Sequence, residues 1–307
     1  AALRAYLPAS ARPTLGGQTP EVVCSHVWAS RNEQCERQVL FIDIGGGHID
    51  FGLVVIDAGI FQVRWAGGRA CGGIDIDVHL AMLCAERARW PSLKTERKGW
   101  QRLLTACEKA KLGLTRAQHA RVHLPKLRGE DDLDVWLSME DLEEAMRLEV
   151  LPKLADCVQE LVSFLGTCCA SGDPVSRVID EVALLGGTMK IPYLQRALEE
   201  LLRKKLAVKE VMFWSKQDGE VSLAHSHAFG AALQGAILGD RSTEEGPLHS
   251  LMLIDTCAQA FNVEVATGLA CVVKAHTPLP TTKSVRLRPQ NAAQQQVVVH
   301  IREAWEG

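Results

Sequence analysis

Apolar positions along the chain fall into two patterns, which predict an α/β region followed by an all-β region. Val39–Ile42 is a short continuous apolar run, as expected of a strand that is covered on both faces. Residues 49–56 and 60–65 flank Asp57-Ala58-Gly59 and predict a β-hairpin. Beyond the polar stretch 241–246, short apolar runs predict further strands at residues 250–254, 262–265, 270–273 and 297–301.

Helical spacing of apolar residues places helices between the earlier strands. Ser138 and Asp141 form a capping-box pattern that predicts a helix start, and Pro152 predicts a kink soon afterwards. Ile191-Pro192 predicts another helix start shortly after the buried strand 182–185. The remaining predicted elements are helices near residues 75–89, 100–107 and 222–238, and a strand pair at 122–127 and 133–137.

Composition changes this picture little, but it excludes some classes of protein. The chain has 307 residues, of which 47% are apolar and 23% charged, so we expect a packed core and room for two domains. A formal net charge of −3 argues against nucleic-acid binding, and no apolar run reaches the ~18 residues of a membrane span. Ten cysteines without a CxxC pair favour free thiols, so we expect a cytoplasmic protein or one from another reducing compartment.

Candidate chemistry begins where the first buried strand ends. Asp43 precedes the glycine run Gly45–Gly47, and glycine lets backbone amides approach an anion closely. Asp43 is placed to bind Mg²⁺ or to orient an attacking water, and Asp50 follows on the returning strand. The segment therefore predicts a phosphate site, and an ordinary glycine turn in a hairpin is an equally weighted alternative.

Two later segments carry polar groups that suit a nucleotide. Gly186-Gly187-Thr188 follows another buried strand and leads into a helix, where a flat ring or a ribose could approach the backbone. Glu108 and Lys111 lie one turn apart on a predicted helix and could hydrogen-bond a sugar. Taken singly, each has a simpler interpretation, namely a helix start without a ligand and a solvated charged face.

Together and in this order, these segments resemble the second lobe of the nucleotide-binding domain in DnaK-like, seventy-kilodalton heat-shock chaperones. The resemblance implies an α/β fold with an actin/hexokinase-like ATPase lobe, in which helices flank a sheet that carries an inserted α+β subdomain. A short, incomplete all-β segment would follow this lobe. The segments that match the family's motifs are Asp43–Asp50, Gly72–Asp77, Ala106–Lys111, Gly186–Pro192 and Ala228–Ala232.

The same resemblance divides the chain into domains. Residues 1–37 are a poorly defined N-terminal segment, and residues 38–240 form the second lobe, with its inserted subdomain at about 73–150. Residues 241–255 correspond to the interdomain linker, and residues 256–307 to the start of the substrate-binding β-sandwich. That region holds about 50 residues, against ~100 in a complete two-sheet sandwich. We therefore expect a partial sandwich, and we expect the family's first lobe to be missing from this chain.

Position by position, the resemblance implies a site for ATP or ADP with Mg²⁺ and K⁺. Asp43 would be the catalytic carboxylate, and Asp43 and Asp50 would serve the metal ions. The implied partners are unfolded polypeptide clients, a J-domain co-chaperone and a nucleotide exchange factor. The residues implied to bind the nucleotide are Gly45, Gly46, Gly47, His48, Gly73, Glu108, Lys111, Thr115, Gly187, Thr188 and Lys190.

Several positions depart from the family's pattern. His48 replaces a threonine near the γ-phosphate, and Lys190 replaces an arginine whose planar guanidinium stacks better on a base. Apolar residues also replace three polar ones of the family. Ile74 replaces a carboxylate near the ribose, Leu112 an arginine that stacks on the adenine, and Ala224 an aspartate near the purine pocket. These replacements lead to two hypotheses about function, which differ in whether the ATPase is active.

The first hypothesis is an ATP-binding heat-shock chaperone that assists protein folding by nucleotide-controlled binding of unfolded polypeptide, with a part in the stress response. The alternative is a non-catalytic regulatory or ribosome-associated co-chaperone with a degenerate ATPase. An unrelated actin-fold sugar kinase or phosphatase is a weaker third, because it would leave the linker and the β-region unexplained. The residues alone leave open whether ATP is hydrolysed.

Overall fold

The structure is a computed structural model, and it describes most of the chain from residue 36 onward. The described residues are 36–57, 60–172, 178–213, 231, 235, 239, 252–257, 259–288 and 296–304. The predicted helix at 222–238, Ala224 and the motif Ala228–Ala232 therefore lie outside them, apart from the isolated positions.

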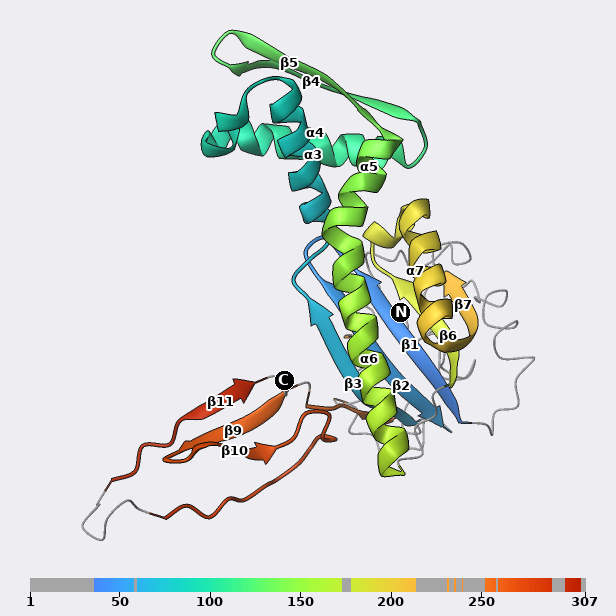
Figure 1. Cartoon of the computed structure of the whole chain (residues 1–307), viewed down its shortest axis with the longest axis vertical. Helices are drawn as coiled ribbons and strands as arrows, with labels where there is room; N and C mark the ends of the chain where they lie inside the picture. Colours follow the sequence, from blue (N-terminus) through green and yellow to red (C-terminus); the bar gives the residue numbers. More distant parts are fainter. Residues whose placement is uncertain are drawn as a thin grey trace.

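A six-stranded sheet forms the body of the lobe, in the order β7-β6-β1-β2-β3-β8 (Figure 1). The pairs β1–β2 and β2–β3 are antiparallel, whereas β1–β6, β6–β7 and β3–β8 are parallel. The predicted strands and hairpin are confirmed within a few residues at each end. The strands are β1 Arg37–Ile44, β2 Ile49–Asp57, β3 Ile60–Arg69, β6 Val178–Leu185, β7 Ala207–Phe213 and β8 Met252–Ile254.

One of these strands, β7, does not stand out in the sequence. Its apolar run is broken by Lys209 and Glu210, a pattern that does not predict a buried strand. In the described sheet β7 lies at the edge beside β6, where one side has no strand neighbour. Edge strands tolerate charged residues, and charge there discourages pairing with other chains.

Two helices, α6 Leu151–Ser171 and α7 Pro192–Lys205, pack beside each other against the sheet (Figure 1). The predicted capping box is confirmed at α5 Met139–Ala145, where Ser138 N–H donates to Asp141 Oδ2 (2.8 Å) and Asp141 N–H donates to Ser138 Oγ (3.2 Å). The irregularity predicted from Pro152 is a π-helical stretch, Met146–Val150, between α5 and α6. None of the described helices is long and apolar enough to cross a membrane.

The predicted insertion is a helical pair with a β-hairpin, and it stands at one end of the sheet (Figure 1). The helices α3 and α4 pack on each other, and α4 packs on the hairpin strand β4. Its buried core includes Leu80, Leu103 and Leu133, each 1% exposed or less. The elements are α3 Gly73–Arg87, the 3₁₀ turn η2 Pro91–Thr95, α4 Arg97–Leu114, β4 His119–Arg128 and β5 Asp131–Ser138.

The last described region is a three-stranded sheet in the order β10-β9-β11. Its strands are β9 Ala260–Val265, β10 Gly268–Val273 and β11 Ile301–Ala304. The prediction of a strand at 297–301 is wrong, because the ladder to β9 begins only at Ile301. Val297 and Val298 are 59% and 77% exposed and pair with no described strand. Their β-branched side chains favour extended backbone, but a strand also needs a neighbour to pair with.

This region is held on the lobe by its linker and one loop. Strand β8, within the range assigned to the linker, adds to β3 with Phe61 opposite Leu253. The loop at 274–279 is tied to the linker, since Leu279 N–H donates to the Asp255 carbonyl (2.8 Å). His276 in this loop lies against two aromatic rings of the lobe, with ring centroids 6.2 Å from Trp65 and 5.1 Å from Phe164.

The cysteines of the described residues are all free thiols, as the sequence predicts. Burial raises the pKa of the Cys71 and Cys157 thiols to about 11, so both stay protonated near neutral pH. The Cys107 thiol lies beside that of Cys84 with its pKa also raised, first by their hydrogen bond and then by burial. Protonated buried thiols are weak nucleophiles, which identifies these cysteines as core residues.

The ring contacts of His276 are expected to stabilise the docking of the β-region on the lobe. We expect His276→Ala to weaken docking, because each aromatic contact contributes ~0.5–1.5 kcal/mol beyond its buried area. Amide hydrogen exchange measured by mass spectrometry should then become about tenfold or more faster at β8. His300→Ala, an exposed histidine of the same region, is the control and should leave exchange at β8 unchanged. Equal exchange in both variants would show that His276 does not hold the two regions together.

Candidate functional site

The glycine turns that follow β1 and β6 lie side by side at one edge of the sheet. Strands β1 and β6 are parallel neighbours with Asp43 opposite Leu185, so their carboxyl ends point the same way. In open α/β sheets this edge is where ligands bind. Gly186 has φ +89°, and a methyl group added to it would lie 2.3 Å from the Ile44 carbonyl oxygen. Only glycine lets the two turns approach so closely.

The carbonyl of Gly45 joins three segments that are far apart in the sequence. It accepts hydrogen bonds from the N–H of Gly73 (3.0 Å) and from the hydroxyl of Thr188 (2.7 Å). Next to it, the Gly46 carbonyl accepts from the N–H of Ile74 (2.7 Å). These bonds fix the first turn between the start of α3 and the turn after β6. The predicted residues Gly45, Gly73 and Thr188 are thus in direct contact.

The same bonds leave the amides of the first turn available to a ligand. The carbonyls of Gly45 and Gly46 point toward their partners, while the N–H groups of Gly46 and Gly47 donate to no other described residue. A methyl group added to Gly46 or Gly47 would have no atom within 4 Å, so open space lies beside both. Successive free amides in a turn form an anion-binding concavity.

His48 closes this turn through its backbone. Its carbonyl accepts the N–H of Gly45 (3.0 Å), and its side chain is exposed. The position that follows the glycines therefore carries an imidazole beside the free amides. An imidazole is larger than a threonine hydroxyl and presents ring nitrogens in place of an oxygen.

Two carboxylates face each other next to the turn. Asp43 and Asp50 are directly opposite in the antiparallel β1–β2 ladder, so their side chains lie on one face of the sheet. Among the described residues no group of three or more His, Cys, Asp or Glu side chains could hold a metal. This pair suits Mg²⁺, which keeps several waters and often binds one or two carboxylates together with phosphate oxygens.

Lys111 is buried at the base of the insertion rather than exposed beside Glu108. Its ammonium donates to Asp77 Oδ2 (2.8 Å) and to the Gly73 carbonyl (2.8 Å), and its side chain is 10% exposed. Burial raises the pKa of Asp77, and the hydrogen bond from Lys111 opposes that shift. Two of the three ammonium protons are therefore used within the protein, which leaves one for the predicted sugar contact.

Asp77 is a residue of this site that the sequence reasoning did not assign. Its signal is the second aspartate of Gly72-Gly73-Ile74-Asp75-Ile76-Asp77, one helical turn after Gly73. A residue four positions into a helix lies on the same face as the first. This face turns toward α4, where Lys111 lies. The pair Asp77–Lys111 thereby holds α3 and α4 together beneath the glycine turns.

The other predicted residues are not joined to this cluster by hydrogen bonds within the described chain. The Thr115 hydroxyl donates to the Leu112 carbonyl of its own helix (2.7 Å). Gly187 and Lys190 lie at the turn after β6, both exposed, and Glu108 is exposed on α4. Two apolar replacements are exposed as well, Ile74 by 58% and Leu112 by 61%.

Comparison with known proteins matches the chain to heat-shock proteins over most of its length. The Hsp70 protein family matches residues 29–306. The chain is 29% identical to a heat shock 70 kDa protein of Emericella nidulans over 87% of this chain and 39% of that protein. Identity is 28% to a heat shock 70 kDa protein of Penicillium citrinum, over 87% of this chain and 50% of that protein.

A third relative gives the same result. It is heat shock cognate 70 kDa protein 3 of Dictyostelium discoideum, which is 29% identical over 87% of this chain and 40% of its own length. The chain therefore spans half or less of the length of these relatives.

The close approach at Gly186 predicts a strong effect of adding one methyl group. Gly186→Ala should destabilise the lobe by about 2 kcal/mol or more, because alanine at positive φ is strained and its methyl would meet Ile44 and Asp43. Gly187→Ala is the matched control, since its φ is −67° and a methyl there meets nothing within 4 Å. Urea unfolding followed by circular dichroism measures both. Equal stability of the two variants would contradict the packing of the two turns described above.

Proposed function

Because the chain belongs to the Hsp70 family, we propose that it is the nucleotide-binding and linker portion of a heat-shock chaperone. ATP or ADP bound at the turn Gly45–Gly47 would control the binding of unfolded polypeptide by the β9–β11 region. One observation carries this proposal: the Gly45 carbonyl joins three segments and leaves the amides of Gly46 and Gly47 open to an anion. The family matches over nearly the whole described chain, so the proposal covers the lobe and the β-region alike.

The described residues fit a magnesium nucleotide. The free amides of Gly46 and Gly47 would bind phosphate oxygens, and Asp43 and Asp50 would bind the cation through water. Mg²⁺ supplies charge neutralisation for the phosphates when it is bound. The base or the ribose would approach Thr188 and Gly187 at the neighbouring turn.

Hydrolysis is proposed for the two-lobed protein. Phosphoryl transfer is catalysed by positioning and by electrostatic stabilisation, which need groups on both sides of the phosphate. On this side, Asp43 would orient a water beside the cation. The family's first lobe would supply the opposing phosphate loop and lysine.

Docking of the linker supports a link between nucleotide and polypeptide binding. Strand β8 extends the sheet that carries the glycine turns, and His276 lies between Trp65 and Phe164 of that lobe. The β-region exposes Phe261 and Ile301 on one face of its sheet, by 36% and 67%, and apolar side chains of this kind suit contact with unfolded chain. A J-domain co-chaperone and a nucleotide exchange factor are proposed partners, and the free thiols support a reducing compartment such as the cytoplasm.

A second candidate is a regulatory relative that binds nucleotide weakly and does not hydrolyse it. The observation that favours it is the apolar and imidazole side chains at the site. Ile74 and Leu112 are exposed, and His48 follows the glycines. Lys111 is also engaged by Asp77, so fewer polar groups remain for the ribose.

The metal pair predicts the response of ATP binding to one substitution. Asp43→Asn should weaken binding of Mg²⁺–ATP at least about tenfold, because a contact with a charged group contributes ~1.5–3 kcal/mol. Isothermal titration calorimetry of ATP with and without Mg²⁺ measures this. Asp57→Asn is the control, because Asp57 lies at the end of β2 away from the glycine turn; this variant should bind as the parent does. Binding that is equal in the two variants would remove Asp43 from the proposed site.

Turnover separates the two candidate functions. The chain extended with a first lobe should release phosphate from ATP, and Asp43→Asn should abolish that release. Phosphate release that persists in Asp43→Asn would exclude this site as its source. Binding without any turnover in the extended protein would favour the regulatory candidate, and absence of binding in both forms would contradict nucleotide control altogether.

A further inference from the structure

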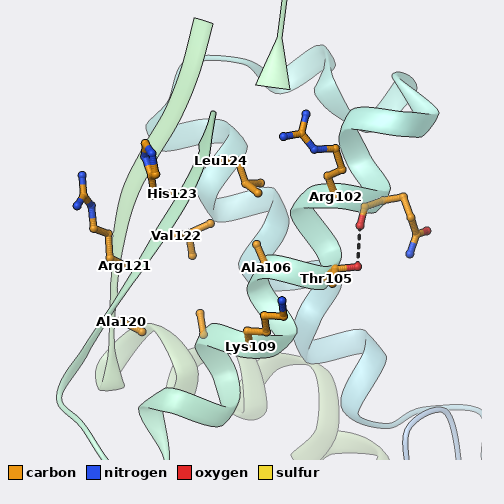
Figure 2. A pocket seen from close by; sticks show the side chains of 11 residues that line it. Arg102, Thr105, Ala106, Lys109, Ala120, Arg121, Val122, His123 and Leu124 are labelled. Carbon is orange, nitrogen blue, oxygen red and sulfur yellow. Dashed lines mark hydrogen bonds between the residues drawn. The ribbon is translucent and has the colours of Figure 1, made fainter. Parts of the chain in front are cut away.

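A pocket of about 550 Å³ lies between α4 and β4, on the side of α4 away from the glycine turns (Figure 2). Lys109 lines it, whereas Lys111, two residues on and about 200° around the helix, faces α3. The pocket is therefore distinct from the site proposed for the nucleotide. Its size lies in the ~300–1,000 Å³ range of small-molecule sites.

The pocket exists because small side chains face each other across the contact between helix and strand. Ala106 of α4 lies across the hollow from Ala120, Val122 and Leu124 of β4 (Figure 2). Ala110 of α4 also lines it. Larger residues at these alanines would fill the space at normal packing density. The hollow thus offers an apolar surface to a ligand.

The helix side of the pocket carries positive charge without a balancing carboxylate. Arg102 and Lys109 are two turns apart on one face of α4 and lie about 10 Å apart along its axis. The guanidinium of Arg102 donates to the carbonyls of Pro125 (2.8 Å) and Lys126 (3.1 Å), which hold it in place, and it forms no ion pair with a described carboxylate. Lys109 forms no ion pair with any described residue, and none of the lining residues is acidic.

The strand side contributes less charge. Arg121 points away from α4 and forms an ion pair with Asp134, which lowers the pKa of that carboxyl (Figure 2). His123 lies 3.9 Å from the same carboxylate. The attraction for an anion therefore rests on Lys109 and Arg102, at the rim of an apolar hollow.

We propose that this pocket binds a small organic anion. Its phosphate or carboxylate would lie near Lys109 and Arg102, and its apolar body would pack on Ala106, Ala120 and Leu124. The proposal does not depend on nucleotide binding at the glycine turns. An alanine-lined hollow of this size suits a compact molecule better than an extended peptide, which would need a long groove.

Phenyl phosphate and benzoate are suitable probes, because they share an aromatic body and differ in the anionic group. Methyl-labelled protein followed by NMR should show saturable shifts of the Ala106 and Ala120 methyl groups with at least one probe. Benzyl alcohol, which is neutral, should bind at least about tenfold more weakly. The probe that binds more tightly identifies phosphate or carboxylate as the preferred group.

Two substitutions test the assignment. Lys109→Glu should weaken binding of the better probe at least about tenfold, and Ala106→Leu should abolish it by filling the hollow. Lys98→Glu, an exposed lysine of the same helix outside the pocket, is the control for net charge and should bind as the parent does. The same shifts should persist when ATP and Mg²⁺ are present.

Three results would overturn the proposal. Equal loss of binding in Lys98→Glu and Lys109→Glu would show only a general charge effect. Displacement of the probe by ATP would place it at the glycine turns. Absence of shifts with both probes at millimolar concentration, or shifts only with a glutamate-rich peptide, would mean that the pocket does not take a small anion.

Discussion

The Gly45 carbonyl is the point on which the candidate site depends. It accepts one hydrogen bond from the first amide of α3 and another from the Thr188 hydroxyl. These bonds connect the turn Gly45–Gly47 to the insertion and to the turn after β6. A carbonyl has two lone pairs, and here both are used within the protein. The following amides of Gly46 and Gly47 donate to no other described residue, which is the property an anion site requires.

The ion pair beneath this carbonyl connects the site to the insertion. Lys111 donates to both Asp77 and the Gly73 carbonyl, and the Gly73 amide donates to the Gly45 carbonyl. Movement of α4 relative to α3 would therefore displace Gly73 and, through it, Gly45. Strand β8 lies at the lateral edge of the same sheet, beyond β3. The glycine turns, the insertion and β8 are thus connected through one sheet, each at a different place.

Local patterns were enough to predict much of this arrangement. The capping box at Ser138 and Asp141, the hairpin of β2 and β3 and the glycine turns follow from short-range backbone chemistry, and the structure contains them. The prediction failed where a strand depended on its neighbour. Strand β7 carries charges because it lies at an edge, and the valines at 297–299 lie outside the strand because β9 pairs only from Ile301 onward.

From the chain alone, the order and spacing of glycines and carboxylates indicate the family and the position of the glycine turn Gly45–Gly47, because turn conformation is a property of a few consecutive residues. The partner of Lys111, the free state of the Gly46 and Gly47 amides, the ring contacts of His276 and the hollow beside Lys109 all require the folded chain. Each brings together groups that are separated by tens or hundreds of residues. Their distances depend on strand register and helix packing, which no local pattern encodes.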